Sequence, residues 1–442
     1  VGAMAKKGAS RRTSETRGRP ARRKSAGQIL VEELHGANGP HPSGWRRLGQ
    51  IVVVPGLAVV SGLLLGGLII VLTSEQVYAG FADSFGQGLQ TAWQAASKAY
   101  AALFTGSIGS PARMVAALQG DDPLEIRRAF NPFLESLVVT TPYIFAGLSV
   151  ALGFRSGLFN IGAEGQLFVG AITSAYVGYS ITGLPAIVHI PLALLAGALG
   201  GALWGLVPGL LKAYTGGHEV INTIMMNYIA FRLSDWLLTG PMQRPDSFNP
   251  ISPTIQDSAM LPQFFESPIR FHLGFFLALG TAWLVYWFLF RTVWGFDLRT
   301  VGANPRAARY AGMSIVKSTV VAMALSGALA GLAGTNEVLG VNHNLAMAFS
   351  SGYGFDSIAL ALLGKSHPVG VVLAALLFGT LRSGATRMQL DAGIPIDIIS
   401  VLQAVILAFV AAPAIIRTIY RIRAPAVAEE GAFVRSWGSA ER

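Results

Sequence analysis

The chain has 442 residues, of which 52% are hydrophobic and only 13% are charged, and its formal net charge is +10. Soluble domains carry roughly 25% charged residues, so this composition excludes a water-soluble globular protein of this size, and its apolar content excludes a disordered chain. The 52 glycines are accompanied by no cysteine, which excludes disulfides, thiolate metal sites and thiol catalysis. The composition predicts an all-α polytopic membrane protein.

The first 47 residues are the most basic segment of the chain. They are rich in Ser, Gly and Arg, hold most of the net positive charge and contain one aromatic residue, Trp45. We expect residues 1–47 to be a disordered cytoplasmic tail near anionic lipid headgroups, without a nucleic-acid partner. We expect no secretory signal, because the first apolar run begins after residue 47 and lacks a small-residue cleavage site.

Long charge-free stretches follow this tail. Residues 48–74 contain no charged side chain, and about 20 apolar residues are enough to cross a bilayer core. Residues 355–364 and 369–381 are shorter and predict either complete spans or half-helices. The other apolar stretches are 132–154, 165–211 (two spans), 220–240, 271–290, 318–336 and 396–416. The pattern predicts about 8–10 transmembrane helices within residues 48–420, with re-entrant or broken helices among them.

The distribution of basic residues predicts the orientation of the spans. In an alternating topology the N-terminal tail, residues 291–317 and residues 421–442 fall on one side, and Lys and Arg favour the cytoplasmic side. Both termini and the loop 291–317 are therefore predicted to be cytoplasmic. Residues 75–131 and 241–270 are then external, and their Pro, Gly and Ser content predicts loop-like structure.

The chain shows no nucleotide-binding loop of its own. The sequence Gly364-Lys365-Ser366 resembles the end of a phosphate-binding loop, but Ala359 stands where that loop requires glycine. A positive-inside lysine at a helix end explains Lys365 better. The seven histidines show no metal-ligand spacing, so we predict neither a metal site nor a catalytic residue.

Polar side chains inside apolar spans are costly and usually face the bundle interior or a water-filled path. Residues 157–166 contain three glycines around the polar side chains, which suits a broken helix that lines a cavity. The alternative is a simple cytoplasmic turn between two spans. The candidate pathway residues in this segment are Phe159, Asn160, Glu164 and Gln166.

Three further polar clusters are candidates for the substrate pathway. The alternatives are hydrogen bonding between helices for the first cluster, exposure at the membrane interface for the second, and a helix cap for the third. The first cluster comprises Glu219, Asn222, Asn227 and Tyr228, the second Asn336 and Glu337, and the third Phe355 and Asp356.

The cytoplasmic loop contains a capped helix signal between residues 302 and 312. Asparagine at the cap, proline in the first turn and glycine at the end predict a short basic helix. Such a helix is either ordinary loop structure or a surface on which an ATPase docks. Its residues are Asn304, Pro305, Arg306, Ala307, Ala308, Arg309, Tyr310 and Gly312.

Together these motifs resemble the permease subunits of bacterial ABC importers for simple sugars and nucleosides, with the branched-chain amino-acid permeases as more distant relatives. The resemblance covers roughly residues 100–420, and Ala-Leu-Phe-Thr-Gly-Ser at 102–107 is most similar to the nucleoside branch. The four strings that carry it are GLFNIGAEGQ (157–166), HEVINTIMMNYIA (218–230), VGANPRAARYAGM (301–313) and GYGFDSIALALLGKSHPVG (352–370).

The resemblance implies a bacterial inner-membrane permease that is not an enzyme, binds no cofactor itself and imports a nucleoside or simple sugar. It implies partners of four kinds: cytoplasmic ABC ATPase subunits that bind ATP-Mg, a second and different permease chain, an extracellular or periplasmic substrate-binding protein, and membrane lipid. By similarity, residues 304–312 would be the coupling helix that contacts the ATPase, and Asn160 and Glu164 would lie near the translocation path.

Three other functions are consistent with the residues. The same machine could carry branched-chain amino acids. An ion-gradient-driven secondary transporter would use Glu164, Glu219 and Asp356 as its intramembrane acids. A purely structural membrane scaffold would leave the polar clusters without a role in transport.

Overall fold

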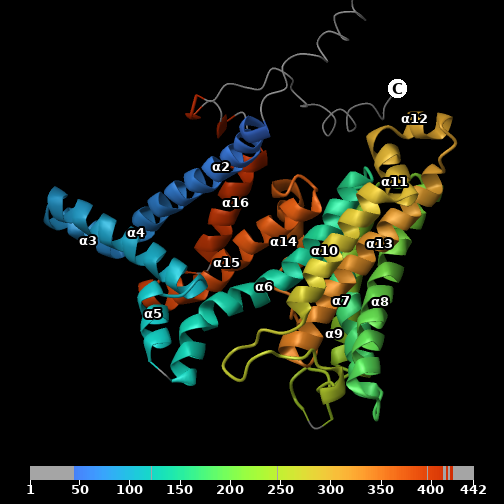
Figure 1. The fold of residues 1–442 in the computed structure, drawn as a ribbon, viewed down its shortest axis with the longest axis horizontal. Helices are drawn as coiled ribbons and strands as arrows, with labels where there is room; N and C mark the ends of the chain where they lie inside the picture. Colours follow the sequence, from blue (N-terminus) through green and yellow to red (C-terminus); the bar gives the residue numbers. More distant parts are fainter. Residues whose placement is uncertain are drawn as a thin grey trace, which may run out of the picture. The chain divides into compact units, whose positions relative to one another are not determined.

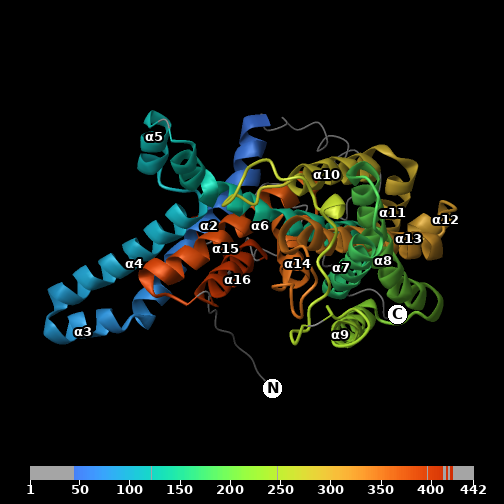
Figure 2. The same ribbon diagram turned by 90° about the horizontal axis from the view of Figure 1, so that it is seen from below.

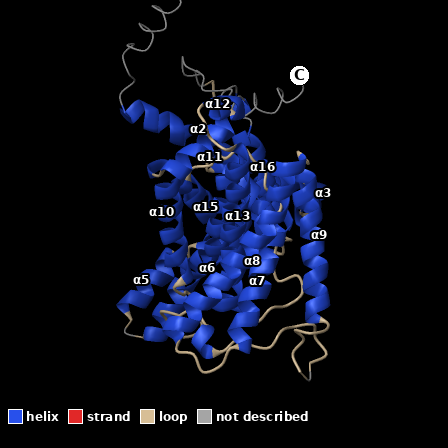
Figure 3. Ribbon diagram, turned by 90° about the vertical axis from the view of Figure 1, so that its right-hand side faces the viewer, coloured by secondary structure: helices blue, strands red, loops and turns tan. Residues whose placement is uncertain are grey.

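All regular secondary structure in the described part of the chain is helical, as Figure 3 shows. The computed structural model describes residues 44–120, 122–245, 247–395, 397–411, 415–416 and 419–421. Among these residues the β-type pairings are two isolated bridges. The all-α prediction is therefore confirmed. The predicted tails lie almost entirely outside the described residues, which begin at residue 44 and end at residue 421.

The chain divides into two compact units, residues 1–53 and 54–442, and the second contains the helical bundle and the candidate site. The helices are, in chain order, α2 (Gly44–Thr73), α3 (Glu75–Asp83), α4 (Phe85–Ser107), α5 (Pro111–Gln119), α6 (Pro123–Arg155), α7 (Ala163–Ser180), α8 (Ala186–Thr215), α9 (Glu219–Leu238), η1 (Asp257–Ala259), α10 (Gly274–Arg291), α11 (Val293–Ala303), α12 (Pro305–Tyr310), α13 (Ile315–Asn336), η2 (Glu337–Asn342), α14 (Tyr353–Leu363), α15 (Pro368–Ala392) and α16 (Asp397–Ala411).

Six of the described helices are long and apolar enough to cross a membrane, which makes the chain a multi-pass membrane protein. These spans lie in α2, α6, α8, α10, α13 with η2, and α15, while α14 and α16 are apolar but shorter. The upper predicted number of spans was larger because it also counted α7, α9, α14 and α16. Most of α7 is buried within the protein, so its polar residues face other helices rather than lipid.

Close packing of small residues joins α7, α8 and α13, which lie side by side in Figure 1. A Cβ atom on Gly331 of α13 would overlap the carbonyl oxygen of Gly197 in α8. A Cβ atom on Gly201 of α8 would likewise overlap the carbonyl oxygen of Gly327 in α13. Small residues bring the helix backbones together, as in many membrane bundles, and α7 packs against both helices.

The long helix α6 forms the other part of the core. Every residue from 140 to 154 is buried, and the helix packs against α10, α13, α14 and α15. A helix segment buried on all sides lies in the interior of the helical bundle, with other helices around it. Besides α6, the helix α15 packs against α4 and also contacts α16 (Figure 2).

The loop-like structure expected for residues 75–131 is wrong, because this segment folds into α3, α4, α5 and the start of α6. Local capping explains these helices: Ser84 accepts a hydrogen bond from the N–H of Gln87, and Asp122 accepts one from Leu124. The Gly and Ser residues that suggested a loop instead permit contact, since Gly106 of α4 packs against Arg387 of α15. That these residues are external remains a prediction.

The two short apolar stretches have different outcomes. α14 has 11 residues and is a half-helix that begins at Tyr353 after an irregular segment. α15 has 25 residues and continues well beyond the predicted end at residue 381. Arg382, which directly follows the apolar stretch in the sequence, therefore lies on this helix, as does Arg387.

Replacing Gly331 by alanine is expected to destabilise the fold by about 1–3 kcal/mol, because its methyl group would push α13 away from α8. Thermal unfolding of the purified protein in detergent measures the effect. Gly280→Ala in α10 is the matched control, since a Cβ at that position meets no atom within 4 Å. Equal unfolding temperatures for the two variants would contradict the packing argument.

Candidate functional site

Two helices begin beside each other in the interior of the bundle. The turn between α6 and α7 includes Gly157 with a φ of +72°, packed closely against Gly302 of α11. Gly352, with a φ of +86°, precedes α14. These left-handed backbone conformations favour glycine, and they direct the N-termini of α7 and α14 toward the same place.

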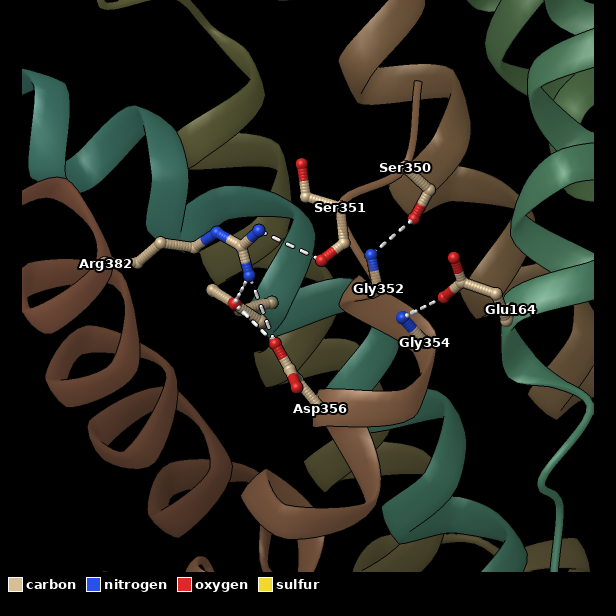
Figure 4. Close-up of polar contacts among 8 residues, drawn as sticks. Glu164, Ser350, Ser351, Gly352, Gly354, Asp356 and Arg382 are labelled. Atoms are coloured by element: carbon tan, nitrogen blue, oxygen red, sulfur yellow. Dashed lines mark hydrogen bonds and ion pairs between the residues drawn. The ribbon is translucent and has the colours of Figure 1, made fainter. Parts of the chain in front are cut away.

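Glu164 connects these two N-termini, as Figure 4 shows. Its Oε2 atom accepts a hydrogen bond of 2.6 Å from the N–H of Gly354, and the residue is only 2% exposed. Beside it, the hydroxyl of Ser350 accepts a hydrogen bond of 3.3 Å from the N–H of Gly352. Helix N-termini carry partial positive charge, so a carboxylate in the first turn of α7 that also contacts the first turn of α14 is favourable for both helices.

Asp356 belongs to a second cluster, built around Arg382 (Figure 4). The hydroxyl of Tyr143 donates to Oδ2 of Asp356 at 2.8 Å and accepts from Nη1 of Arg382 at 2.9 Å. The same Nη1 lies 3.3 Å from the Asp356 carboxylate, and Nη2 donates to the carbonyl oxygen of Ser351 at 2.9 Å. The guanidinium also lies over the ring of Tyr353. α6, α14 and α15 thus meet at one ion pair.

The sequence analysis missed Arg382 and Tyr143. Arg382 directly follows the apolar stretch 369–381, where it marked the end of a span, and Tyr143 lies in an apolar run. An intramembrane arginine is the available signal, but only a helix longer than the apolar stretch places it inside the bundle.

Asn160 and Gln166 fasten α6, α7 and α13 together. Nδ2 of Asn160 donates to Oε1 of Gln166 and to Oγ of Ser326, both at 2.8 Å, and Ser326 in turn donates to the carbonyl oxygen of Ser149. All four residues are buried. A buried polar network with its partners satisfied stabilises one arrangement of the helices.

Asn227 attaches α9 to the start of α7. Its Oδ1 accepts from the N–H of Gly165 at 2.8 Å, and its Nδ2 donates to the carbonyl oxygen of Ile161 at 3.0 Å. Hydrogen bonding between helices was the alternative interpretation of the polar residues on α9, and Asn227 forms such a bond with α7.

The other predicted pathway residues lie away from this junction, except Phe355 in the first turn of α14. Glu219 forms an ion pair with Lys212 at 2.9 Å, and Tyr228 is 61% exposed on α9. Phe159 packs against Phe154 with ring centroids 5.0 Å apart. Four residues complete the set: Asn222 is half-buried on α9, Phe355 is 45% exposed beside Asp356, and Asn336 and Glu337 are buried at the end of α13.

His272 and Asn336 are two buried polar residues that lie close together near the end of α13. The side-chain amide of Asn336 and Nε2 of His272 have no hydrogen-bond partner among the described residues. Gly274 and Gly340 both contact the imidazole closely. Burial lowers the pKa of His272 to about 4, with smaller contributions from His343 and Arg270. The ring is therefore neutral at physiological pH.

The helix predicted in the cytoplasmic loop is present as α12. Asn304 caps it by accepting from the N–H of Ala307 at 3.1 Å, Pro305 begins it, and Gly312 follows it with a φ of +79°. Ala308 is buried, whereas the side chains of the other residues are exposed, and Tyr310 is 95% exposed. The helix presents its polar face for a partner, although its coupling role remains a prediction.

Comparison with known proteins gives a consistent result. Residues 133–411 match the family described as branched-chain amino acid transport system / permease component. The chain is 39% identical to a guanosine ABC transporter permease of Bacillus subtilis, over 84% of this chain and 96% of that protein. It is 32% identical to a nucleoside ABC transporter permease of Lactococcus lactis, over 83% and 92%. It is 37% identical to a glucose ABC transporter permease of Haloferax volcanii, over 62% and 74%. No solved structure matches the chain.

Glu164→Ala is expected to destabilise the protein by about 1–3 kcal/mol, because the buried N–H of Gly354 loses its acceptor. Thermal unfolding in detergent measures this change. The matched control is Glu266→Ala, which removes a carboxylate from a largely exposed pair with Arg127 and is expected to cost under about 1 kcal/mol. Similar effects of the two substitutions would refute the special role of Glu164.

Acidification is expected to destabilise the protein through His272. Its folded pKa of about 4 lies below the ordinary value of 6.5, so its contribution is complete above pH 6.5 and is lost as the pH falls toward 4. The loss is roughly 3 kcal/mol. Unfolding temperatures of wild type and His272→Gln at pH 7 and pH 4.5 test this, with His218→Gln as an exposed control. Only His272→Gln should reduce the pH dependence.

Proposed function

This chain belongs to the permease-component family of branched-chain amino acid transport systems, and on that basis we propose that it is the membrane-spanning subunit of an ATP-driven importer for nucleosides. The observation that carries the proposal is the likeness to the guanosine permease, which extends over nearly the whole of both chains. The chain is a transport component, and ATP-Mg is bound and hydrolysed on separate cytoplasmic subunits.

The packing supports a route from α12 to the polar junction. α11 leads directly into α12, and Gly302 of α11 packs against the backbone of Ser156 and Gly157. The same turn carries Asn160 and ends at α7, whose first turn contains Glu164. A displacement of α12 by an ATPase therefore moves the turn that positions the start of α7, because backbones in contact leave no space for independent movement.

A second connection lies at the same end of the bundle. Nε of Arg155 donates to the carbonyl oxygen of Ser366 at 2.9 Å, and Nη2 donates to that of Lys365 at 3.2 Å. The end of α6 is thus tied to the turn between α14 and α15. Movement at the cytoplasmic end reaches both helices that meet at Glu164, as alternating access to a central path requires.

The complete transporter contains further chains. A substrate-binding protein outside the membrane delivers the nucleoside, a second and different permease completes the path, and paired ATPases close and separate below α12. The chain lies in the bacterial plasma membrane with its N-terminus in the cytoplasm. The polar residues of the candidate site line the path, with Glu164, Phe355 and Asp356 at the junction of α7 and α14.

A simple sugar is the second candidate substrate. The glucose permease of Haloferax volcanii is 37% identical to this chain, but over 62% of its length, against 84% for the guanosine permease. Parallel uptake of labelled nucleosides and glucose by the assembled transporter distinguishes the two substrates.

Inactivating the partner ATPase is expected to abolish nucleoside uptake into cells that express the complete transporter. ATP binding and hydrolysis supply the energy for the movement of α12. Uptake that persists with an inactive ATPase, and that instead follows an imposed ion gradient, would favour a secondary transporter.

The double variant Arg306→Glu/Arg309→Glu is expected to weaken association with the ATPase by at least about tenfold, because it reverses two exposed charges on α12. Co-purification from mild detergent measures the amount of ATPase bound. Arg232→Glu, on an 86% exposed side chain of α9, is the matched control. An unchanged ATPase yield from the double variant removes the coupling assignment.

A further inference from the structure

A cavity of about 680 Å³ lies beside the Arg382 cluster. Arg382, Ser383 and Thr386 of α15 line it together with residues of α4, α5 and α6 and the segment around Arg270, and Tyr353 also contributes to its wall. This volume is within the usual range for small-molecule sites, about 300–1,000 Å³. None of the residues predicted from the sequence to line the pathway contributes to it.

The wall of this cavity is rich in hydrogen-bond donors, and carboxylates neutralise most of its arginines, although Glu135 is the one of these carboxylates that lines the cavity itself. Five arginines line it, and four of them form ion pairs with a carboxylate. The fifth, Arg113, has no ion pair among the described residues. The pairs are Arg128 with Glu125, Arg270 with Glu135, Arg382 with Asp356, and Arg387 with Asp391. Such a wall suits a neutral solute that accepts hydrogen bonds better than it suits an anion.

Arg382 is the most firmly oriented of these donors. Tyr143 and Asp356 occupy Nη1, the carbonyl oxygen of Ser351 takes one hydrogen of Nη2, and the ring of Tyr353 lies 5.4 Å below the guanidinium. Among the described residues, this leaves Nε–H and the second Nη2 hydrogen without an acceptor. These two N–H groups are adjacent and parallel, which is the geometry that binds two neighbouring acceptors at once.

We propose that this cavity is a solute-binding site of the permease and that the free edge of Arg382 recognises nucleosides whose base presents two adjacent acceptors. The inference rests on the proposed function and specifies its substrate class. A 6-keto purine, such as the base of inosine or guanosine, offers O6 and N7 to one guanidinium. Adenine offers N7 beside an amino donor, which would face a second donor on Arg382.

The carboxylates around the cavity support the same choice. Each of the four carboxylates described above is already paired with an arginine. The 6-amino group of adenine therefore meets no unpaired carboxylate among them. O6 of a 6-keto purine accepts from Arg382 without breaking any of these pairs.

The test compares uptake of inosine and adenosine by the complete transporter, with the same binding protein and ATPase throughout. Arg382→Lys keeps the positive charge but removes the fork of parallel donors. We expect the inosine-to-adenosine uptake ratio to fall about tenfold, the usual cost of one lost bidentate base contact. Arg232→Lys is the matched control, because it also pairs with an aspartate at 3.3 Å but lies on α9, outside the cavity.

A second variant tests the cavity without altering the arginine cluster. Thr386→Trp fills the space from α15 and is expected to reduce uptake of both nucleosides severalfold, with the same amount of ATPase co-purified. Undiminished uptake by this variant, or an unchanged ratio in Arg382→Lys, overturns the assignment of the site while leaving nucleoside import intact. A wild-type transporter that imports glucose and neither nucleoside overturns the proposed function and this inference together.

Discussion

The contact between the Glu164 carboxylate and the N-terminus of α14 is the interaction on which the rest of the site depends. It joins the first turns of two helices, where backbone N–H groups have no partner within their own helix. The carboxylate accepts from the N–H of Gly354 in α14 and itself lies in the first turn of α7, so its charge is favourable at the start of both helices. The Asp356–Arg382 pair then extends the junction to α15.

This junction exists only because the helices around it pack backbone to backbone. Gly354 leaves room for Glu164, since a Cβ there would overlap the backbone of that residue, and Gly201 and Gly331 bring α8 and α13 together. Small residues thus allow the helix backbones to pack closely, and polar side chains such as Asn160 form hydrogen bonds between the packed helices. The same tight packing at Gly157 and Gly302 connects α11, which leads into α12, with the turn that precedes α7.

Sequence reasoning predicted the features that depend on neighbouring residues. The cap at Asn304 and the glycine at Gly312 were enough to predict α12, and the charge-free stretches predicted the apolar helices. It failed where distant packing decides the outcome. α4 packs on α15, and Arg382 enters the bundle because α15 extends past its apolar stretch. Ser84 and Asp122 are local capping signals for helices in the segment 75–131, but the packing of these helices on distant elements leaves no local pattern in the sequence.

The sequence by itself determined that this protein is an all-α membrane protein, and its polar clusters named Glu164 and Asp356 as residues of interest. These conclusions follow from hydropathy and from the cost of polar groups in apolar spans, which are properties of short segments. Only the tertiary structure decided that Glu164 meets a helix 190 residues away and that Arg382 lines a cavity. Hydrogen bonds between distant residues depend on how the helices pack, and that packing arises from the whole chain.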